Sequence, residues 1–430
     1  MRPLRIRALG LLVLAVGCSR VPLPSSRVPP SSSAPASSSA APSGDPCSQT
    51  VDIDGVRALP VQCPPFGACS SKSPPQPSDG LALPASHSFL DGHPECKQAL
   101  PTVAQGDCNA CWAFSVAGLL SARVCKARYH AGMRAFDVLS PQMVLSCTAS
   151  AFPRSNGCAA EGGKPAEALQ WIASHELLDE DCVPYVATSS ATDGALASQC
   201  GEMRGRCPGK ERFTVTAAGY VIGDEEAMKR AIYLSGPIAS VLRLPASLQD
   251  FAGGEAIFAM TKADIDRFSV EDACDEKLAK KRAIPGYCHV NGKDGALKTK
   301  TMHVVLIFGW GEDPVSRERY WIVRNWWGEE QYALWGGGSS AKPYGARSAS
   351  AKPLTGPFLR MKRGIDTEHH ADAAGGLITN PSFLASVVSK KDAAAHKVVL
   401  DGDERDGATG SASGRDLFGE ADAARVCTGK

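Results

Sequence analysis

The sharpest chemical feature of this 430-residue chain is the segment 105–115 (QGDCNACWAFS), which holds Cys108 and Cys111. Apolar residues recur at three- and four-residue steps from 111 to 129, which predicts a helix that begins at Cys111. A thiol at a helix N-terminus faces unpaired N–H groups and the positive end of the helix dipole, which lower its pKa and make it a stronger nucleophile. Such a thiolate needs a second stabiliser, usually an imidazolium. Cys111 is therefore the candidate nucleophile.

The segment 105–115 resembles the active-site pattern of the papain family of cysteine peptidases, Q-G-x-C-G-S-C-W-A-F. The resemblance implies that Cys111 is the nucleophile. It also implies that Gln105 donates its side-chain amide to the oxyanion, beside the backbone N–H of Cys111. Donors of this kind are typically worth roughly 3–4 kcal/mol of barrier each. Asn109 and Ala110 stand where the family pattern has Gly-Ser.

A histidine and an asparagine follow in the order that papain-like enzymes use. His303 opens the apolar run 302–311, where a histidine taken alone is more often structural than catalytic. The segment 320–328 (YWIVRNWWG) resembles the family's Y-W-x-x-K/R-N-S-W-G, with Trp326 in place of the usual Ser. By this resemblance His303 is the acid–base partner, Asn325 holds its ring in the productive tautomer, and Trp327 covers that hydrogen bond from water.

The substrate-binding residues are also implied by the resemblance. Gly162 and Gly163, after Cys158, resemble the family's G-C-x-G-G, where glycine lets a substrate backbone approach and pair as an added strand. The alternative is that these glycines only form a turn. The remaining implied residues form an apolar pocket for the second substrate residue before the cut bond (S2); they are Pro165, Ile238 and Val304.

Sixteen cysteines predict a disulfide framework rather than a metal site, because the chain also carries an export signal. Within the family, the segments Leu83-Pro-Ala-Ser86, Pro94-Glu-Cys96 and Pro165-Ala-Glu-Ala168 resemble the cathepsin B branch. That likeness pairs Cys96 with Cys125 and Cys108 with Cys158. Four more cysteines form two bridges: cathepsin B suggests Cys147–Cys200 with Cys182–Cys207, and other relatives suggest Cys147–Cys182 with Cys200–Cys207. Proximity in the sequence suggests a last bridge, Cys274–Cys288.

Cathepsin B carries paired histidines in an occluding loop, and none lies between Cys182 and Cys207 here. His369 and His370 are far along the chain. We therefore expect an endopeptidase rather than an enzyme that releases dipeptides. Its partners would be protein or peptide substrates, with no cofactor or metal.

Three alternatives remain open at this point. Trp326 and the altered pair 109–110 allow a non-catalytic relative that keeps the fold as a binding protein. Cys108 and Cys111 spell CxxC, which allows a thioredoxin-like redox protein. A zinc site would need a second ligand pair at close spacing, and none is convincing.

The elements around these residues predict an α+β fold. Helices are expected at 111–129, 141–146, 165–175 and 224–234, and strands at 213–222, 238–244, 303–308 and 320–325. The resemblance implies the two-lobed papain-like architecture. A helical left lobe would face an antiparallel, barrel-like right lobe, with the active-site cleft between them. Polar insertions interrupt the strands at about 259–300 and 336–355, and residues 357–364 look like the closing strand of the family.

The two ends differ from this catalytic domain, which we place at 83–372. Three arginines precede a short apolar run in residues 1–17, which predicts a signal peptide, and Cys18 after small residues resembles a bacterial lipobox. Residues 18–46 are a Ser/Pro/Ala-rich tether, and 47–82 are a Cys/Pro-rich extension or short pro-segment. Residues 373–430 read as a polar, poorly ordered tail. We expect an exported monomer, lipid-anchored at the cell envelope through Cys18 or secreted.

The overall charge excludes one class of partner. The formal net charge is +1, and no stripe of Lys and Arg with interleaved aromatics is present, so nucleic-acid binding is not expected.

Overall fold

The structure is a computed structural model of the chain. It describes residues 50–61, 73–100, 104–106, 108–133, 137–152, 157–158, 162–186, 193–251, 256–268, 290–291, 297–298, 302–327, 358–364 and 379–389. Several predictions from sequence lie outside these residues: the signal peptide, the tether with Cys18, the insertion 336–355, and the Cys274–Cys288 bridge.

Three of the helices begin at a capping side chain or at a proline in the first turn. Helix α3 starts after Ser140, whose side chain accepts a hydrogen bond from the N–H of Met143, and α7 starts after Asp224, which caps Ala227 in the same way. Pro165 opens α4. The helices are α1 (Phe89–Gly92), α2 (Cys111–His130), α3 (Pro141–Ala151), α4 (Pro165–Ser174), α5 (Asp193–Ser198), α6 (Cys200–Gly205) and α7 (Glu225–Ser235), with 3₁₀ turns at Pro94–Ala99 and Ala246–Asp250.

The strands form one large sheet in the order β1-β2-β4-β12-β5-β9-β10-β11-β6, with β3 beside β9. Its pairs are antiparallel except β11 with β6. The strands are β1 (Val51–Ile53), β2 (Val56–Pro60), β3 (His87–Ser88), β4 (Phe213–Val221), β5 (Ile238–Arg243), β6 (Ile257–Phe258), β9 (Met302–Glu312), β10 (Arg319–Arg324), β11 (Phe358–Lys362) and β12 (Thr379–Ser389), with a separate pair of β7 (Val290–Asn291) and β8 (Leu297–Lys298).

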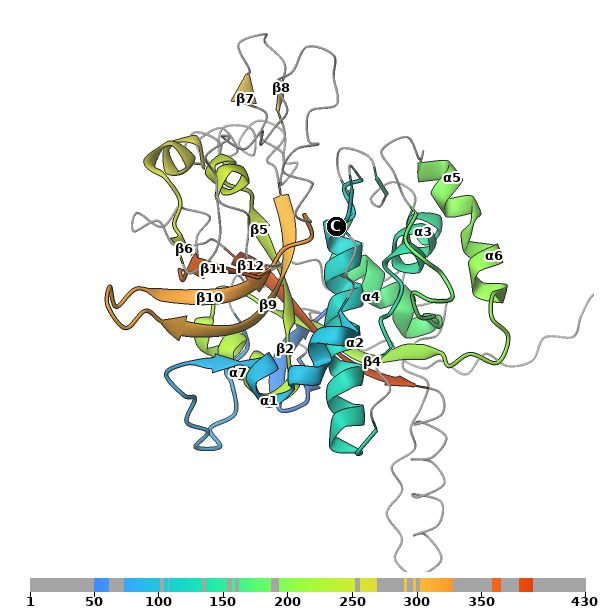
Figure 1. Ribbon diagram of the computed structural model, residues 1–430, viewed down its shortest axis with the longest axis horizontal. Helices are drawn as coiled ribbons and strands as arrows, with labels where there is room; N and C mark the ends of the chain where they lie inside the picture. Colours follow the sequence, from blue (N-terminus) through green and yellow to red (C-terminus); the bar gives the residue numbers. More distant parts are fainter. Residues whose placement is uncertain are drawn as a thin grey trace, which may run out of the picture. The chain divides into compact units, whose positions relative to one another are not determined.

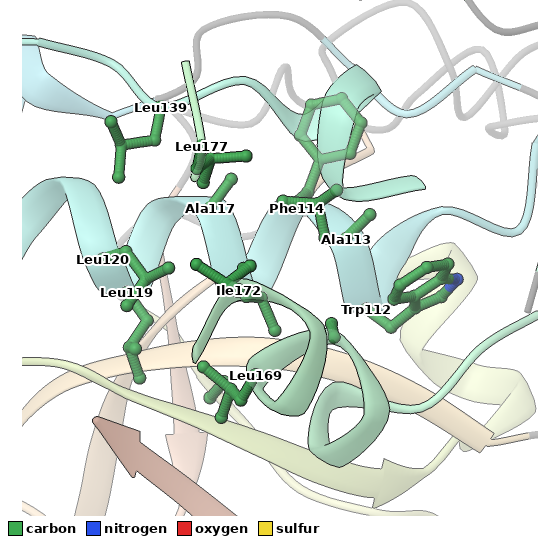
Figure 2. Close-up of a cluster of buried hydrophobic side chains, with 14 of the residues drawn as sticks. Trp112, Ala113, Phe114, Ala117, Leu119, Leu120, Leu139, Leu169, Ile172 and Leu177 are labelled. Carbon is green, nitrogen blue, oxygen red and sulfur yellow. The ribbon is translucent and has the colours of Figure 1, made fainter. Parts of the chain in front are cut away.

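Helix α2 lies between the sheet and helices α3 to α6 (Figure 1). It is buried on nearly every side: Trp112, Phe114 and Leu120 are all fully buried. Figure 2 shows Leu169 and Ile172 of α4 lying against it. A helix apolar all round must lie inside a domain, so the residue at its N-terminus is placed by packing on all sides.

Two hydrophobic clusters lie on opposite faces of β5 and β9. Alternate residues such as Val241 and Val304 join the helical cluster, while Leu242 and Val305 join a second cluster with α7. The arrangement is the α+β, two-lobed papain-like fold, with one lobe mainly helical and the other built on the antiparallel sheet.

The structure differs from the sequence prediction at the N-terminal side. Residues 51–60, assigned to an extension or pro-segment, form the hairpin β1–β2 that pairs with β4. Ile53, Val56 and Ala58 are fully buried. Gly219 of β4 permits this contact, because a Cβ there would lie 2.7 Å from the carbonyl oxygen of Leu59. The hairpin is therefore part of the same domain as β4.

The C-terminal boundary also differs. Residues 379–389, assigned to a polar tail, form β12, which pairs with both β4 and β5 in the middle of the sheet. Phe383, Leu384 and Ala385 are buried. The guanidinium of the buried Arg123 on α2 donates to the carbonyl of Ala385, over 2.8 Å. The domain therefore extends beyond 372, through at least residue 389.

Candidate active site

The first residue of α2 is the only cysteine without a disulfide among the described residues, Cys111. Its side chain is 9% exposed, at the edge of the buried surface. Cys108 is bonded to Cys158, so the redox alternative lacks its second thiol in this structure. The candidate nucleophile is thus a free thiol at a helix N-terminus.

Strand β9 brings the histidine to this helix. Helix α2 packs against β9, and the backbone of Val304, one residue after His303, is among the groups that lower the pKa of the Cys111 thiol. Nε2 of His303 lies 2.8 Å from Oδ1 of Asn325. The N–H of Trp326 donates to the same oxygen at 2.8 Å, so this oxygen accepts both bonds and the ring carries its proton on Nε2. Nδ1 is then the basic nitrogen.

A tryptophan ring covers this pair. The rings of His303 and Trp327 lie 4.9 Å apart with a tilt of 34°, and Trp327 is 8% exposed. His303 itself is 3% exposed. Water is therefore largely kept from the His303–Asn325 hydrogen bond.

Burial acts against charge on both reacting groups. Burial raises the pKa of the Cys111 thiol to about 11. Hydrogen bonds from the backbones of Val304, Trp112 and Cys111 lower that pKa, but by less. Burial lowers the pKa of His303 to about 4, although the hydrogen bond to Asn325 raises it. Neither charge is favourable alone, so a thiolate and an imidazolium are expected to form together, by transfer of the thiol proton to Nδ1.

The Asn325 hydrogen bond leads to the first prediction. Replacing Asn325 with alanine will lower kcat by up to about 100-fold, because the imidazolium loses a stabilising acceptor and the ring loses its orientation. The hydrogen bond raises the pKa of His303, so its loss moves that pKa further down and shrinks the population of the ion pair. The pH dependence of Cys111 alkylation by iodoacetamide measures this population. An unchanged alkylation rate near pH 6 in a folded variant would contradict the assignment.

Gln105 is fixed by three hydrogen bonds. Its N–H donates to the carbonyl of Trp326 at 2.9 Å, its carbonyl accepts from the hydroxyl of Tyr185 at 2.6 Å, and its Nε2 donates to the carbonyl of Cys108 at 2.9 Å. The side chain is 1% exposed. One N–H of the amide donates to Cys108, so the second N–H of the same group is not used by that bond.

The glycine pair lies across from the start of α2. Gly162 has a φ of +64°, and a Cβ there would lie 3.2 Å from the carbonyl oxygen of Asn109. A side chain at 162 would thus be strained and crowded against the segment that precedes Cys111. Gly163 follows it, and Pro165 opens α4 next to them.

Two of the residues predicted to line one pocket, Ile238 and Val304, belong to different hydrophobic clusters. Val304 of β9 pairs directly with Val241 of β5, and both join the helical cluster on the face toward α2. Ile238 is three residues before Val241, so its side chain points to the other face; it is fully buried in the second cluster. Val241, which is 9% exposed, lies on the same face as Val304. Strand alternation with Val304 could have revealed this residue.

The four disulfides of the described residues decide between the alternative pairings. Cys96 is bonded to Cys125 and Cys108 to Cys158, as the resemblance implied. The other bridges are 147–200 and 182–207, the pattern of the cathepsin B branch. Such a density of disulfides is typical of proteins that are secreted or otherwise exported from the cytosol.

A family model described as papain family cysteine protease matches residues 90–294 and 287–337, more than half of the chain. The chain belongs to the papain family. The matched region includes Cys111, His303 and Asn325. At the level of the family, the chain is a papain-like cysteine peptidase, a hydrolase.

Curated relatives in the papain family are distant. The chain is 26% identical to mouse cathepsin K over 64% of its own length and 71% of that protein. It is 26% identical to cathepsin B-like cysteine proteinase 5 of Caenorhabditis elegans, over 58% of the chain and 69% of the relative. It is 27% identical to bovine pro-cathepsin H, but spans only 52% of that protein.

Two solved structures of the papain family are also similar. One is the procathepsin B S9 of Trypanosoma congolense, at 18% identity and a TM-score of 0.47, covering 73% of this chain and 82% of that one. The other is the Carica candamarcensis cysteine protease CMS1MS2 in complex with E-64, at 22% identity and a TM-score of 0.40, covering 71% and 99%.

Two further features concern metals and membranes. No cluster of three or more His, Cys, Asp or Glu side chains suited to a metal ion occurs in the part of the chain that the structure describes. Over the same residues, no helix has the length and apolar character needed to cross a membrane.

Proposed function

We propose that this chain is a cysteine endopeptidase that hydrolyses peptide bonds through an acyl-enzyme intermediate. Its nucleophile is Cys111, its acid–base group is His303, and Asn325 orients the histidine ring. One observation carries the proposal: an unbonded thiol at the N-terminus of α2 lies against the strand whose histidine is hydrogen-bonded to Asn325.

The reaction follows from these positions. The thiolate of Cys111 attacks the peptide carbonyl carbon, and the carbonyl electrons move to the oxygen. Nε2 of Gln105 and the N–H of Cys111 stabilise this oxyanion. Protonated Nδ1 of His303 gives its proton to the leaving amine as the C–N bond breaks. Water, deprotonated by the same nitrogen, then hydrolyses the thioester and restores the thiol.

Two measurements test this proposal: hydrolysis of a blocked peptide with an internal reporter tests the endopeptidase activity, and labelling of Cys111 tests the nucleophile. Hydrolysis of the peptide, together with labelling of Cys111 by a thiol-directed epoxide at mildly acid pH, is the expected result. Removal of residues two at a time from an unblocked C-terminus would instead indicate a dipeptide-releasing enzyme. The segment between Cys182 and Cys207, which has no histidine, supports endopeptidase activity.

The non-catalytic alternative depends on Trp326 and on the pair 109–110. Trp326 is buried, and the His303–Asn325 hydrogen bond lies intact beside it, which favours the enzyme. Folded, reduced protein that binds peptides but takes up no epoxide would support the binding protein instead.

We assign the substrate backbone to Gly162 and Gly163, and the apolar S2 pocket to Pro165, Val241 and Val304. Replacing Val241 with leucine will shift the preferred P2 residue to a smaller one, with at least about a tenfold change in relative kcat/KM, because one added methylene is worth roughly 1–3 kcal/mol in a hydrophobic pocket. The matched control, Ile238→Val, will cost about 0.5–1.5 kcal/mol of stability and leave the preference unchanged. A peptide library measures both; a shift with the control alone would restore Ile238 to the pocket.

We also propose that the chain is exported and carries lipid on Cys18, after the signal peptide at 1–17. The signal-like residues support this, as do the disulfides, which are rare in the cytosol. The intact mass of the mature N-terminal peptide distinguishes a lipid-modified from a merely secreted monomer.

A further inference from the structure

A buried tryptophan occupies the position where the papain family usually has serine. Trp326 is 2% exposed, and its indole Nε1 donates to Oγ of Ser115 over 2.7 Å. That hydroxyl in turn donates to the carbonyl of Val304 over 3.0 Å. The indole is thus connected through one side chain to the residue that follows His303.

Helix α2 has space for this ring because residue 118 is glycine. Ser115 and Gly118 lie four and seven residues after Cys111, on one face of the helix. A Cβ at Gly118 would lie 3.0 Å from Cη2 of Trp326 and 3.2 Å from Cδ2 of Leu306. The indole therefore lies directly against the helix backbone at this point.

The backbone of Trp326 contacts the two other functional residues. Its N–H donates to Oδ1 of Asn325, the oxygen that also binds the His303 ring. Its carbonyl accepts from the N–H of Gln105. Trp326 therefore forms hydrogen bonds with Asn325, Gln105 and Ser115, and Ser115 extends this connection to β9.

We propose that Trp326, with Ser115 and Gly118, forms a positioning unit that sets how closely β9 approaches α2. The inference rests on the proposed function, since its effect is to hold Nδ1 of His303 in reach of the Cys111 sulfur. The large side chain at residue 326 fits only because residue 118 has no side chain. Trp326 and Ser115 touch no substrate atom in the proposed reaction, so they are positioning residues rather than catalytic ones.

Single substitutions test the hydrogen bond and the close packing separately. Trp326→Phe keeps a ring but removes the N–H, and Gly118→Ala pushes a methyl group against the indole. Each is expected to lower kcat by about 10- to 100-fold with KM changed less than about twofold, since a displacement of about 1 Å can cost 100-fold. The rate of Cys111 alkylation near pH 6 will fall with kcat, because fewer molecules hold the ion pair.

A double variant makes the test decisive. Trp326→Ser restores the family residue and leaves an empty space, and Gly118→Ala partly fills it. In that background the alanine will restore kcat at least about threefold, whereas alone it is harmful, and such coupling is the mark of residues in contact. Additive losses in the double variant would overturn the proposal.

Two substitutions serve as matched controls. Gly201→Ala places a methyl group in α6 where nothing lies within 4 Å. Trp321→Phe alters an equally buried indole on β10 whose N–H has no hydrogen-bond partner among the described residues. Both controls will keep the wild-type alkylation profile with pH.

Failure of this inference differs from failure of the proposed function. An active, labelled wild type whose Trp326 and Gly118 variants keep their kcat and pH profile would overturn the positioning unit alone. Losses that only follow the folded fraction, with an unchanged pH profile, would do the same. A folded wild type without hydrolysis or labelling would overturn the proposed function.

Discussion

Replacing Cys111 with alanine will lower kcat for peptide hydrolysis by at least about 10⁴-fold, because the loss of a nucleophile from a catalytic unit costs on the order of 10⁴- to 10⁶-fold. No other described cysteine offers a free thiol to substitute for it. The side chain is small and lies at the edge of the core, so the change in unfolding free energy will stay below about 1 kcal/mol. Hydrolysis of the blocked peptide, with unfolding followed by circular dichroism, measures both quantities.

The matched variant for this prediction is His303→Ala. If the thiol and the imidazole ring act as one unit, each single variant will lose about as much activity as the double variant Cys111→Ala/His303→Ala. Losses that multiply in the double variant, or more than about 1% of wild-type activity in Cys111→Ala, would mean that the nucleophile lies elsewhere. Cys111→Ser distinguishes binding from chemistry, because it retains the shape of the site while a buried hydroxyl stays protonated.

Ending the chain after residue 378 will prevent stable folding. Strand β12 pairs with β4 on one side and β5 on the other, so its removal leaves two adjacent strands without a partner. Loss of the buried Phe383 alone would cost about 3–5 kcal/mol. The total stability of a domain is roughly 5–15 kcal/mol, so the loss of the complete strand exceeds what the fold can spare. Soluble yield and resistance to an added protease measure the effect.

A chain that ends after residue 391 is the control, since it keeps every described strand. Phe383→Ala is a milder version, expected to lower the unfolding free energy by about 3–5 kcal/mol while the folded fraction keeps its kcat. A chain ended after 378 that melts like the wild type would show that β12 is dispensable.

The local sequence predicts α2, α4 and α7 and strands β4, β5 and β10 to within about one residue. The predicted helix 141–146 ends five residues before α3 does, and the predicted strand 303–308 ends four residues before β9 does. The short helices α1, α5 and α6 were not predicted. Alternating β-branched residues gave the strand that forms β4, and three- and four-residue steps gave α2. Their signals are local because each element is long enough to show its period. Cys111 was indicated by its place at the start of a predicted helix, and His303 and Asn325 were indicated by the resemblance of their segments to papain-family motifs.

The misplaced parts depend on contacts between distant segments. Strands β1 and β2 have three and five residues, too few for alternation to be decisive, and only pairing with β4 defines them. Pro381 interrupts the β12 segment, and a proline argues against a central strand from sequence alone. The burial of Trp326 depends on the glycine at 118, which lies in another element.

The central position of β12 in the sheet also determines when the nascent chain can complete its fold. Strands β4 and β5 are neighbours in sequence but are joined through a partner that leaves the ribosome long after both of them. A sheet with so distant a closure forms slowly, since the intervening loop must first lose its freedom. The hydrolase therefore completes its central sheet only after residues 379–389 have been synthesised.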